Sequence, residues 1–172
     1  MNRILIAVLA LLTSGVAQAA SEQVTLHTVT EHGIGAAIGK VTLSETPWGL
    51  EFTPELTGLA PGVHGFHIHA KGSCEPGESG GKTVAAGAAG GHFDPGNTGK
   101  HLGPYANGHL GDLPALFVTD NGNADYPVLA PRIKSLNEIK GKALMVHVGG
   151  DNHADHPLPL GGGGARFACG VI

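Results

Sequence analysis

The feature of this sequence that most constrains its fold is the abundance of residues that interrupt helices: 29 of its 172 residues are glycine and 11 are proline. A glycine inside a helix costs about 1 kcal/mol relative to alanine, and a proline about 3 kcal/mol. This composition argues against a helical protein. Only 14 % of the residues are charged and 41 % are apolar, which is enough for a buried core and unlike a disordered chain. We expect a single soluble domain.

The charge balance argues against nucleic acid as a partner. The chain has 10 basic and 14 acidic side chains, a formal net charge of −4 and no run of basic residues. Phosphate backbones require clustered cations. The unusual count is that of histidine, 11 residues, which makes metal binding the leading hypothesis.

Residues 1–19 have the pattern of a secretory signal peptide. A short positive start at Arg3 precedes an apolar run over 4–12, and small residues stand at Ala17 and Ala19, where a signal peptidase reads the chain. The apolar run is too short to span a bilayer. We predict cleavage after about Ala19, a mature domain of residues 20–172 and no membrane contact after cleavage. In an exported chain, the pair Cys74 and Cys169 indicates a structural disulfide rather than a catalytic or metal-binding couple.

The mature chain reads as short strands around one long irregular segment. Alternation of apolar and polar residues predicts strands at 24–30, 34–44, 50–52, 63–69, 115–119, 143–148 and 165–171, with an eighth near 124–129. Short strands joined by tight turns are typical of a sandwich or barrel. Residues 70–114 are a long segment without strand pattern, and a compact domain seldom carries such a loop without a function. The glycine run 161–164 allows the backbone to turn or to approach another group closely.

Two histidines lie on one face of a predicted strand. His67 and His69 are two positions apart, so both imidazoles project from the same side while Phe66 and Ile68 point to the other. This arrangement suits two ligands of one ion. His64 has the opposite parity and is predicted to make a structural hydrogen bond.

A third strand histidine and four loop residues extend the set. His147 lies in the predicted strand 143–148, opposite the core-facing side chains of Leu144, Val146 and Val148. The irregular segment supplies His92, His101, His109 and Asp112 at spacings of 9, 8 and 3. Metal bonds and a disulfide are among the few means by which such a loop offsets its ordering entropy.

Ligand chemistry sorts these side chains into two sites. Three histidines and one carboxylate, as in His92, His101, His109 and Asp112, form a closed structural zinc set. Four imidazoles without sulfur suit tetragonal copper(II). Six histidines for seven histidine positions require one imidazole to serve both metals, and His92 is the candidate.

Four motifs resemble one family, the copper/zinc superoxide dismutases, in their exported bacterial branch. They are Gly65-Phe66-His67-Ile68-His69, Gly91-His92-Phe93-Asp94-Pro95, Gly108-His109-Leu110-Gly111-Asp112 and Ala165-Arg166-Phe167-Ala168-Cys169-Gly170-Val171. The resemblance covers essentially all of residues 21–172. It implies an all-β fold, an eight-stranded antiparallel Greek-key β-barrel (an immunoglobulin-like sandwich) with a long metal-binding loop. This fold is expected from the resemblance, because the architecture of the family is already established.

The resemblance also implies ligands and an activity. It places one copper per subunit on His67, His69, His92 and His147, and one zinc on His92, His101, His109 and Asp112. It implies the disulfide between Cys74 and Cys169, a carboxylate at Asp151 joining His67 to His101, with Asp155 as the alternative, and Arg166 as the residue that attracts and orients the anion.

The activity that follows is dismutation of superoxide to dioxygen and hydrogen peroxide in antioxidant defence. His92 would accept and deliver a proton, the location would be the periplasm, and a homodimer is the assembly considered beside a monomer.

Three alternatives stand beside this hypothesis. An exported protein of the same fold that stores or delivers copper and zinc without catalysis would need neither a bridging histidine nor Arg166. A cupin-type enzyme would need a glutamate a few residues after His69, where the first acid is Glu75. A zinc hydrolase would need a His-Glu-x-x-His motif or a nucleophile elbow, and the sequence has neither.

Overall fold

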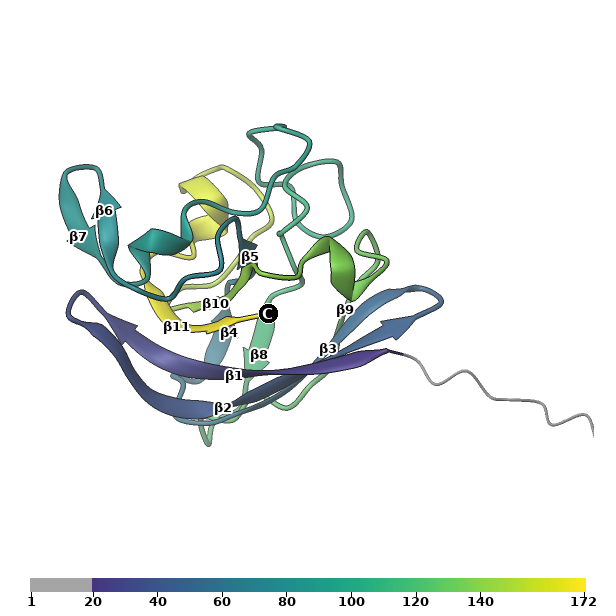
Figure 1. The fold of residues 1–172 in the computed structure, drawn as a ribbon, viewed down its shortest axis with the longest axis horizontal. Coiled ribbons are helices and arrows are strands. Elements are labelled where there is room, and N and C mark those ends of the chain that lie inside the picture. The colour runs from purple at the N-terminus through teal and green to yellow at the C-terminus, as the bar shows by residue number, and fades with distance from the viewer. Residues whose placement is uncertain (1–19) are drawn as a thin grey trace, which may run out of the picture.

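The computed structural model describes residues 20–172, and the signal peptide expected at 1–19 lies outside the described residues. The described chain is built almost entirely of β-strands and loops (Figure 1). The strands are β1 (Ser21–Thr30), β2 (Gly33–Thr46), β3 (Gly49–Leu56), β4 (Gly62–His64), β5 (Phe66–His69), β6 (Gly77–Ser79), β7 (Lys82–Val84), β8 (Leu116–Val118), β9 (Val128–Ala130), β10 (Ala143–His147) and β11 (Arg166–Val171). Three short 3-10 helices, η1 (Gly87–Ala89), η2 (Leu136–Glu138) and η3 (Pro159–Gly162), lie in the connections.

Seven strands form one curled antiparallel sheet, in the order β5-β10-β11-β1-β2-β3-β9. The pairs β5-β10 and β11-β1 join strands that are far apart in the sequence, as the long return connections of Greek-key folds do. A second pair, β4-β8, faces the curled sheet, and β6-β7 is a separate hairpin. The prediction of an all-β antiparallel fold with a long irregular loop is confirmed.

The predicted number of eight strands is not confirmed, because the described residues form eleven. The expected strand 63–69 is two strands, since the chain leaves the β4-β8 pair at Gly65 and joins β10 through β5. The expected strand 124–129 is a single bridge from Ala124 to Leu56 followed by the short β9. The β6-β7 hairpin lies inside the segment predicted to be irregular.

The two faces of β10 pack into different apolar clusters. Leu144 and Val146 belong to the main core between the sheet and β4-β8, whereas Ala143 and Met145 belong to a smaller cluster with both cysteines. Val148 was expected to face the core, but it follows the end of β10 and is half exposed. The main core includes Phe52 and Phe66, whose rings meet edge to face.

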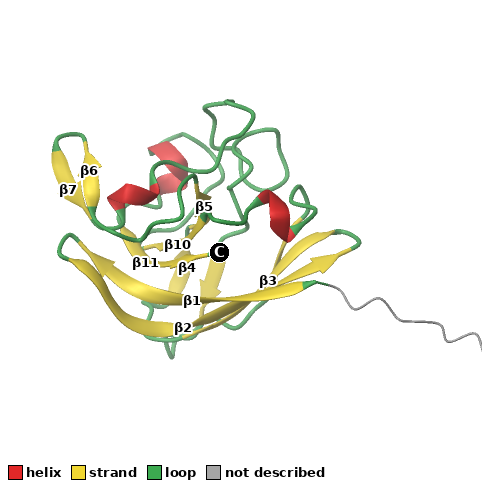
Figure 2. Cartoon of the chain, in the orientation of Figure 1, coloured by secondary structure: helices red, strands yellow, loops and turns green. Residues whose placement is uncertain are grey.

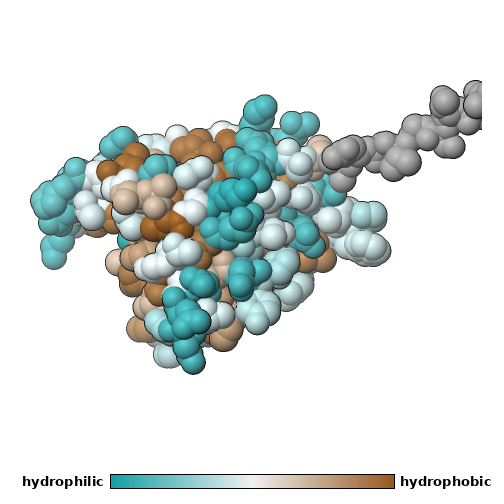
Figure 3. Space-filling model, turned by 90° about the horizontal axis from the view of Figure 1, so that it is seen from below, coloured by the Kyte–Doolittle hydropathy of each residue, from teal (hydrophilic) through white to brown (hydrophobic). Residues whose placement is uncertain are grey.

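The long loops gather on one side of the curled sheet, with η1 and η3 near β10 and β11 and η2 near β3 (Figure 2). The opposite face, seen from below in Figure 3, mixes hydrophilic and hydrophobic residues. None of the helices in the described part of the chain has the length and apolar character needed to cross a membrane.

Candidate metal centre

Strand β5 presents two histidines to the loop side of the sheet. Phe66 and Ile68 are fully buried in the main core, and His67 and His69, which alternate with them, are buried on the other face. The parity predicted from the sequence is therefore present. Both faces of β5 are covered, so the imidazoles are held within the protein rather than in solvent.

The long loop runs back along the free edge of β5 and places its own ligand-type side chains there. Isolated bridges pair His69 with His92 and His67 with Asp112. Gly111 accepts from the Ile68 amide at 2.8 Å, and a β-carbon at Gly111 would lie 2.3 Å from the Ile68 carbonyl oxygen. This close approach requires glycine, and it aligns the loop with the strand.

His147 and Arg166 meet at an irregularity in the β10-β11 ladder. Val146 is paired with Ala168, but the next pair is His147 with Arg166, so Phe167 is the extra residue of a β-bulge. Bulges bend a strand and redirect its side chains. Here the bulge lies next to the histidine cluster and positions one side chain from each strand at it.

The structure brings the predicted ligands into two clusters that share His92. In each cluster the ligand-type atoms lie within 4.8 Å of one another. The first contains His67, His69, His92 and His147, and the second contains His92, His101, His109 and Asp112.

Hydrogen bonds at the Nδ1 atoms of His69 and His147 show which ring nitrogen of each histidine carries the lone pair. His69 Nδ1 lies 2.8 Å from the carbonyl oxygen of Gly90, and His147 Nδ1 lies 3.1 Å from that of Gly164. A carbonyl only accepts, so both Nδ1 atoms donate and both neutral rings keep a lone pair on Nε2. These Nε2 atoms are 3.3 Å apart. Two lone pairs facing each other at this distance fit a bound cation between them.

Asp151 fixes two more rings in the same way. His67 Nε2 and His101 Nε2 donate to its two carboxylate oxygens, each at 2.7 Å. Nδ1 is then the remaining ring nitrogen of each histidine: that of His67 is buried without a hydrogen-bond partner, and that of His101 lies beside the Asp112 carboxylate. Hydrogen bonds of this kind set the tautomer of metal-ligating histidines. The chain uses Asp151 for this contact, while Asp155, the alternative from the sequence, contacts backbone amides instead.

The second cluster converges on one carboxylate oxygen. Asp112 Oδ1 lies 2.9 Å from His92 Nδ1, 3.0 Å from His101 Nδ1 and 3.2 Å from His109 Nδ1. His92 therefore points Nδ1 into this cluster, and its Nε2 is buried without a hydrogen-bond partner. Three nitrogens and one carboxylate oxygen are the donor set of a closed zinc site. The residues of both clusters thus fit the metals expected from the sequence.

Burial and charge give the two clusters different proton affinities. Burial lowers the pKa of His92 to about 4 and that of His147 to about 3, and it holds the pKa of His69 well below the usual value. Burial alone also lowers the pKa of His101, but hydrogen bonds to Asp112 and Asp151 outweigh it and raise that pKa to about 9.

The two carboxylates respond to the same contacts. Burial raises the pKa of Asp112 and of Asp151, but hydrogen bonds from His101 and a second histidine dominate and hold each pKa well below its ordinary value. Without metal, the four imidazoles of the first cluster are neutral at pH 7, whereas in the second cluster the Asp112 carboxylate faces the His101 imidazolium. A metal ion at the second cluster would displace that proton.

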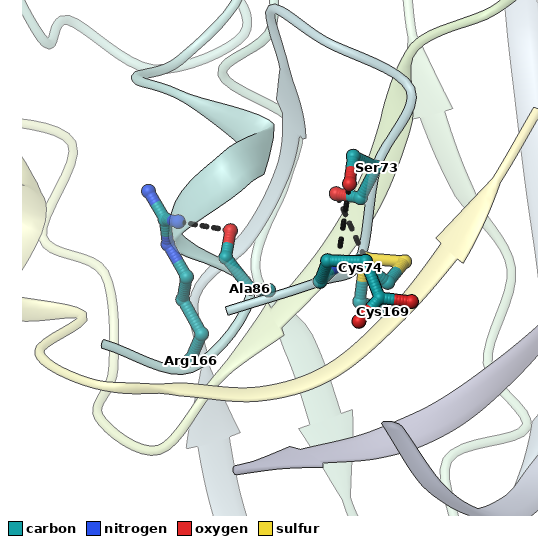
Figure 4. The surroundings of a disulfide bond; sticks show 6 residues. Ser73, Cys74, Ala86, Arg166 and Cys169 are labelled. Carbon is teal, nitrogen blue, oxygen red and sulfur yellow. Dashed lines mark hydrogen bonds between the residues drawn. A yellow bond between two sulfur atoms is a disulfide. The ribbon is translucent and has the colours of Figure 1, made fainter. Parts of the chain in front are cut away.

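Arg166 lines the cavity that leads to the first cluster. The cavity holds about 290 Å³, and His69, His92, His147 and Leu160 also line it. The guanidinium donates to the carbonyl oxygen of Ala86, as Figure 4 shows, and to that of Gly90. Burial lowers the pKa of Arg166, but a guanidinium stays charged in proteins.

The predicted disulfide is confirmed, and it fastens the loop that holds Arg166. Cys74 and Cys169 are bonded, with α-carbons 5.7 Å apart, and join residues 95 positions apart (Figure 4). Cys169 lies on β11, as does Arg166, and Cys74 begins the loop that carries Ala86 and Gly90. Gly90 accepts from both Arg166 and His69, so one carbonyl links the guanidinium to a ligand-type imidazole.

Two supporting contacts have no signal in the sequence. Arg132 donates to the carbonyl oxygens of Gly108 and His109, each at 3.0 Å, and so supports the backbone of a predicted ligand. The carbonyl of Gly164 orients His147, and only the glycine run around it was noted. His64 is outside both clusters and, as predicted, makes structural contacts, with ring nitrogens 2.6 Å from the His147 carbonyl oxygen and 2.8 Å from that of Ala60.

Comparisons with known proteins agree on one family. The family model described as copper/zinc superoxide dismutase matches residues 37–172. The chain is 63 % identical over all of its length to "Superoxide dismutase [Cu-Zn]" of Escherichia coli K12, covering 99 % of that protein.

Two solved structures give the same result. The Cu/Zn superoxide dismutase of Brucella abortus is 55 % identical, with a TM-score of 0.87 over 89 % of this chain and 99 % of the other. The monomeric copper, zinc superoxide dismutase of Salmonella enterica is 63 % identical, with a TM-score of 0.80 over the same shares.

Proposed function

The chain belongs to the copper/zinc superoxide dismutase family, and on that basis we propose which of its residues hold the metals and assist the reaction. The enzyme converts two superoxide anions and two protons into one dioxygen and one hydrogen peroxide, and its metals are copper and zinc. A non-catalytic metal carrier of the same fold, the alternative considered from the sequence, is not favoured by the relatives.

We propose that the first cluster, His67, His69, His92 and His147, holds copper and that the second, His92, His101, His109 and Asp112, holds zinc. The observation that carries this assignment is the position of His92 in both clusters. Bound copper supplies one-electron exchange with superoxide, and bound zinc supplies a fixed positive charge.

The residues of the chain then have distinct tasks. Arg166 attracts the anion to the cavity and orients it beside His69 and His147. His92 Nε2 takes up a proton and delivers it to the product, while Nδ1 stays directed to Asp112. Asp151 keeps His67 and His101 in the tautomers that present Nδ1.

Substitution of the shared histidine tests the assignment. In the metal-loaded wild type, removal of zinc is expected to change the copper(II) absorption and electron paramagnetic resonance spectra, because the second nitrogen of His92 loses its metal. In His92→Ala, zinc removal is expected to leave the copper(II) spectrum unchanged. His32→Ala, an exposed histidine outside both clusters, is the control and should behave as wild type. Wild-type spectra that do not respond to zinc removal would contradict a shared imidazole.

We propose further that residues 1–19 direct export to the periplasm and that residues 20–172 are the mature enzyme. The close relatives are bacterial enzymes, which supports this location. The N-terminal sequence of the protein recovered from the periplasm should begin at Ala20.

A homodimer stays a prediction. Val63 and Phe117 are opposite each other in the β4-β8 pair and half exposed, so an apolar face is present. The Salmonella relative, in contrast, is monomeric. Sedimentation at several protein concentrations would show a concentration-dependent dimer if the prediction holds, and a single species with the mass of one chain if it is wrong.

A further inference from the structure

The segment from Asp151 to Gly161 is folded tightly over the second cluster. Its ends are tied together by the amide of Asn152, which donates to the Gly161 carbonyl oxygen at 3.1 Å, and by the amide of Gly161, which donates to Ala154 at 2.9 Å. Gly161 lies directly against the bond between Asp151 and His101. A β-carbon there would be 2.0 Å from Asp151 Oδ1 and 2.8 Å from His101 Nε2.

Asp155 connects this segment to the backbone of a ligand histidine. Its Oδ2 accepts from the amide of His101 at 2.9 Å, and its Oδ1 accepts from the amide of Leu160 at 3.2 Å. Leu160 directly precedes Gly161 and lines the cavity that contains Arg166. One carboxylate therefore joins the loop that carries His101 to the turn that covers its side chain.

The two contacts complement those of Asp151. Asp151 fixes the imidazole of His101, and Asp155 fixes the backbone of the same residue. The amide of His101 holds the pKa of the Asp155 carboxyl below its usual value, which agrees with an ionised acceptor. Asp155 is in neither cluster, so its contacts act on the ligand through the chain rather than on the metal.

We propose that Asp155 is a positioning residue of the zinc site, which sets the place of His101 Nδ1 by anchoring the His101 backbone to the turn before Gly161. This inference rests on the proposed assignment of His101 to zinc. Partners of metal ligands outside the coordination sphere commonly contribute about 10–100-fold to metal affinity. Loss of Asp155 should therefore weaken zinc binding by about that factor while copper binding is kept.

The variant Asp155→Asn tests this in the full-length mature protein. Asparagine has the same shape, but its terminal NH₂ group cannot accept a hydrogen bond, so it can keep at most one of the two backbone amide contacts. Zinc affinity is measured by competition with a chromophoric chelator, and copper affinity in parallel. Asp125→Asn, at an exposed acid with no side-chain hydrogen bond among the described residues, makes the same change in charge and is the control.

A spectroscopic measurement separates positioning from general stability. Cobalt(II) bound at the zinc position reports ligand geometry through its visible absorption, and Asp155→Asn is expected to shift that band relative to wild type and Asp125→Asn. Zinc affinity within twofold of the control, an unshifted cobalt band, or an equal loss of copper and zinc would overturn the proposal.

The variant Asp112→Ala distinguishes this inference from the assignment beneath it. If Asp112→Ala loses zinc and Asp155→Asn does not, only the positioning role fails. If Asp112→Ala retains wild-type zinc affinity, the zinc site itself is wrongly placed, and the role of Asp155 falls with it.

Discussion

At the scale of single residues, the sequence predicted side chains that recur in a pattern and missed contacts made by backbone groups. His67 and His69 could be placed because strand periodicity puts them on one face. The carbonyl of Gly90, which orients His69 and binds Arg166, could not be predicted because every residue carries a carbonyl. Arg132 was missed for a related reason, since an isolated arginine gives no sign of the backbone it will contact.

Replacement of Arg166 should separate attraction of the substrate from metal binding. We expect Arg166→Ala to lower the rate of superoxide removal by about 10-fold or more, the range over which charge steering raises association rates. Copper content should stay at the wild-type level, because Arg166 is in neither cluster. The rates are measured at several ionic strengths on protein of known metal content.

The control for this substitution is Lys40→Ala, which removes the same charge from a surface ion pair with Glu55. It should leave the rate unchanged. Loss of copper from Arg166→Ala would assign Arg166 a structural role and contradict the prediction.

At the scale of elements, the alternation of apolar residues located the long strands and missed those without a buried face. The range 63–69 was one pattern in the sequence, but the chain changes its partner strand from β8 to β10 at Gly65. Hydrophobic alternation gives no sign of such a change of partner strand. The β6-β7 hairpin has mostly exposed residues, so it shows no alternation. Its turn, Gly80-Gly81, has positive φ at both residues and is a two-residue hairpin signal that could have revealed it.

The disulfide should stabilise the element that carries the partners of Arg166. For a closed loop of nearly 100 residues, the chain-entropy relation gives about 4–5 kcal/mol. We expect the double variant Cys74→Ser, Cys169→Ser to lose stability of this size, measured by urea unfolding of the metal-free protein. Reductant should bring the wild type to the stability of the variant and leave the variant unchanged. A variant as stable as the oxidised wild type would contradict this prediction.

At the scale of the whole molecule, the fold brings the proposed ligands from distant parts of the sequence into one buried site. His67 comes from β5, His147 from β10 and Asp112 from the long loop, and each is nearly inaccessible to solvent. The Greek-key arrangement, which brings these segments together, was expected from family resemblance and not from periodicity. Local patterns specify strands, whereas strand order depends on contacts between residues far apart in the sequence.

Burial of so many imidazoles predicts how stability of the metal-free protein depends on pH. His92, with a pKa of about 4, and His147, with a pKa of about 3, both titrate near 6.5 when unfolded, so the unfolded chain binds more protons below pH 6.5. Stability should therefore fall on acidification from pH 6.5, by up to about 1.4 kcal/mol per pH unit for each group.

His101 acts in the opposite direction. Its pKa of about 9 in the folded protein means that its contribution is complete below pH 6.5 and is lost as the pH rises to about 9. Melting temperatures of the metal-free protein between pH 4 and 9 should thus have a maximum near pH 6.5. A melting temperature that is constant from pH 6.5 to 4 would contradict the role given to the buried neutral rings.

The position of the disulfide has a consequence for proteolytic cleavage of the chain. The exposed turn Gly80-Gly81 lies between Cys74 and Cys169, at a hairpin tip of the kind that proteases cleave most readily. Cleavage there leaves one fragment with Cys74 and the other with Cys169, still covalently joined. A nicked enzyme would therefore keep both halves until a reductant separates them, so proteolysis at this tip and reduction must act together to dismantle the molecule.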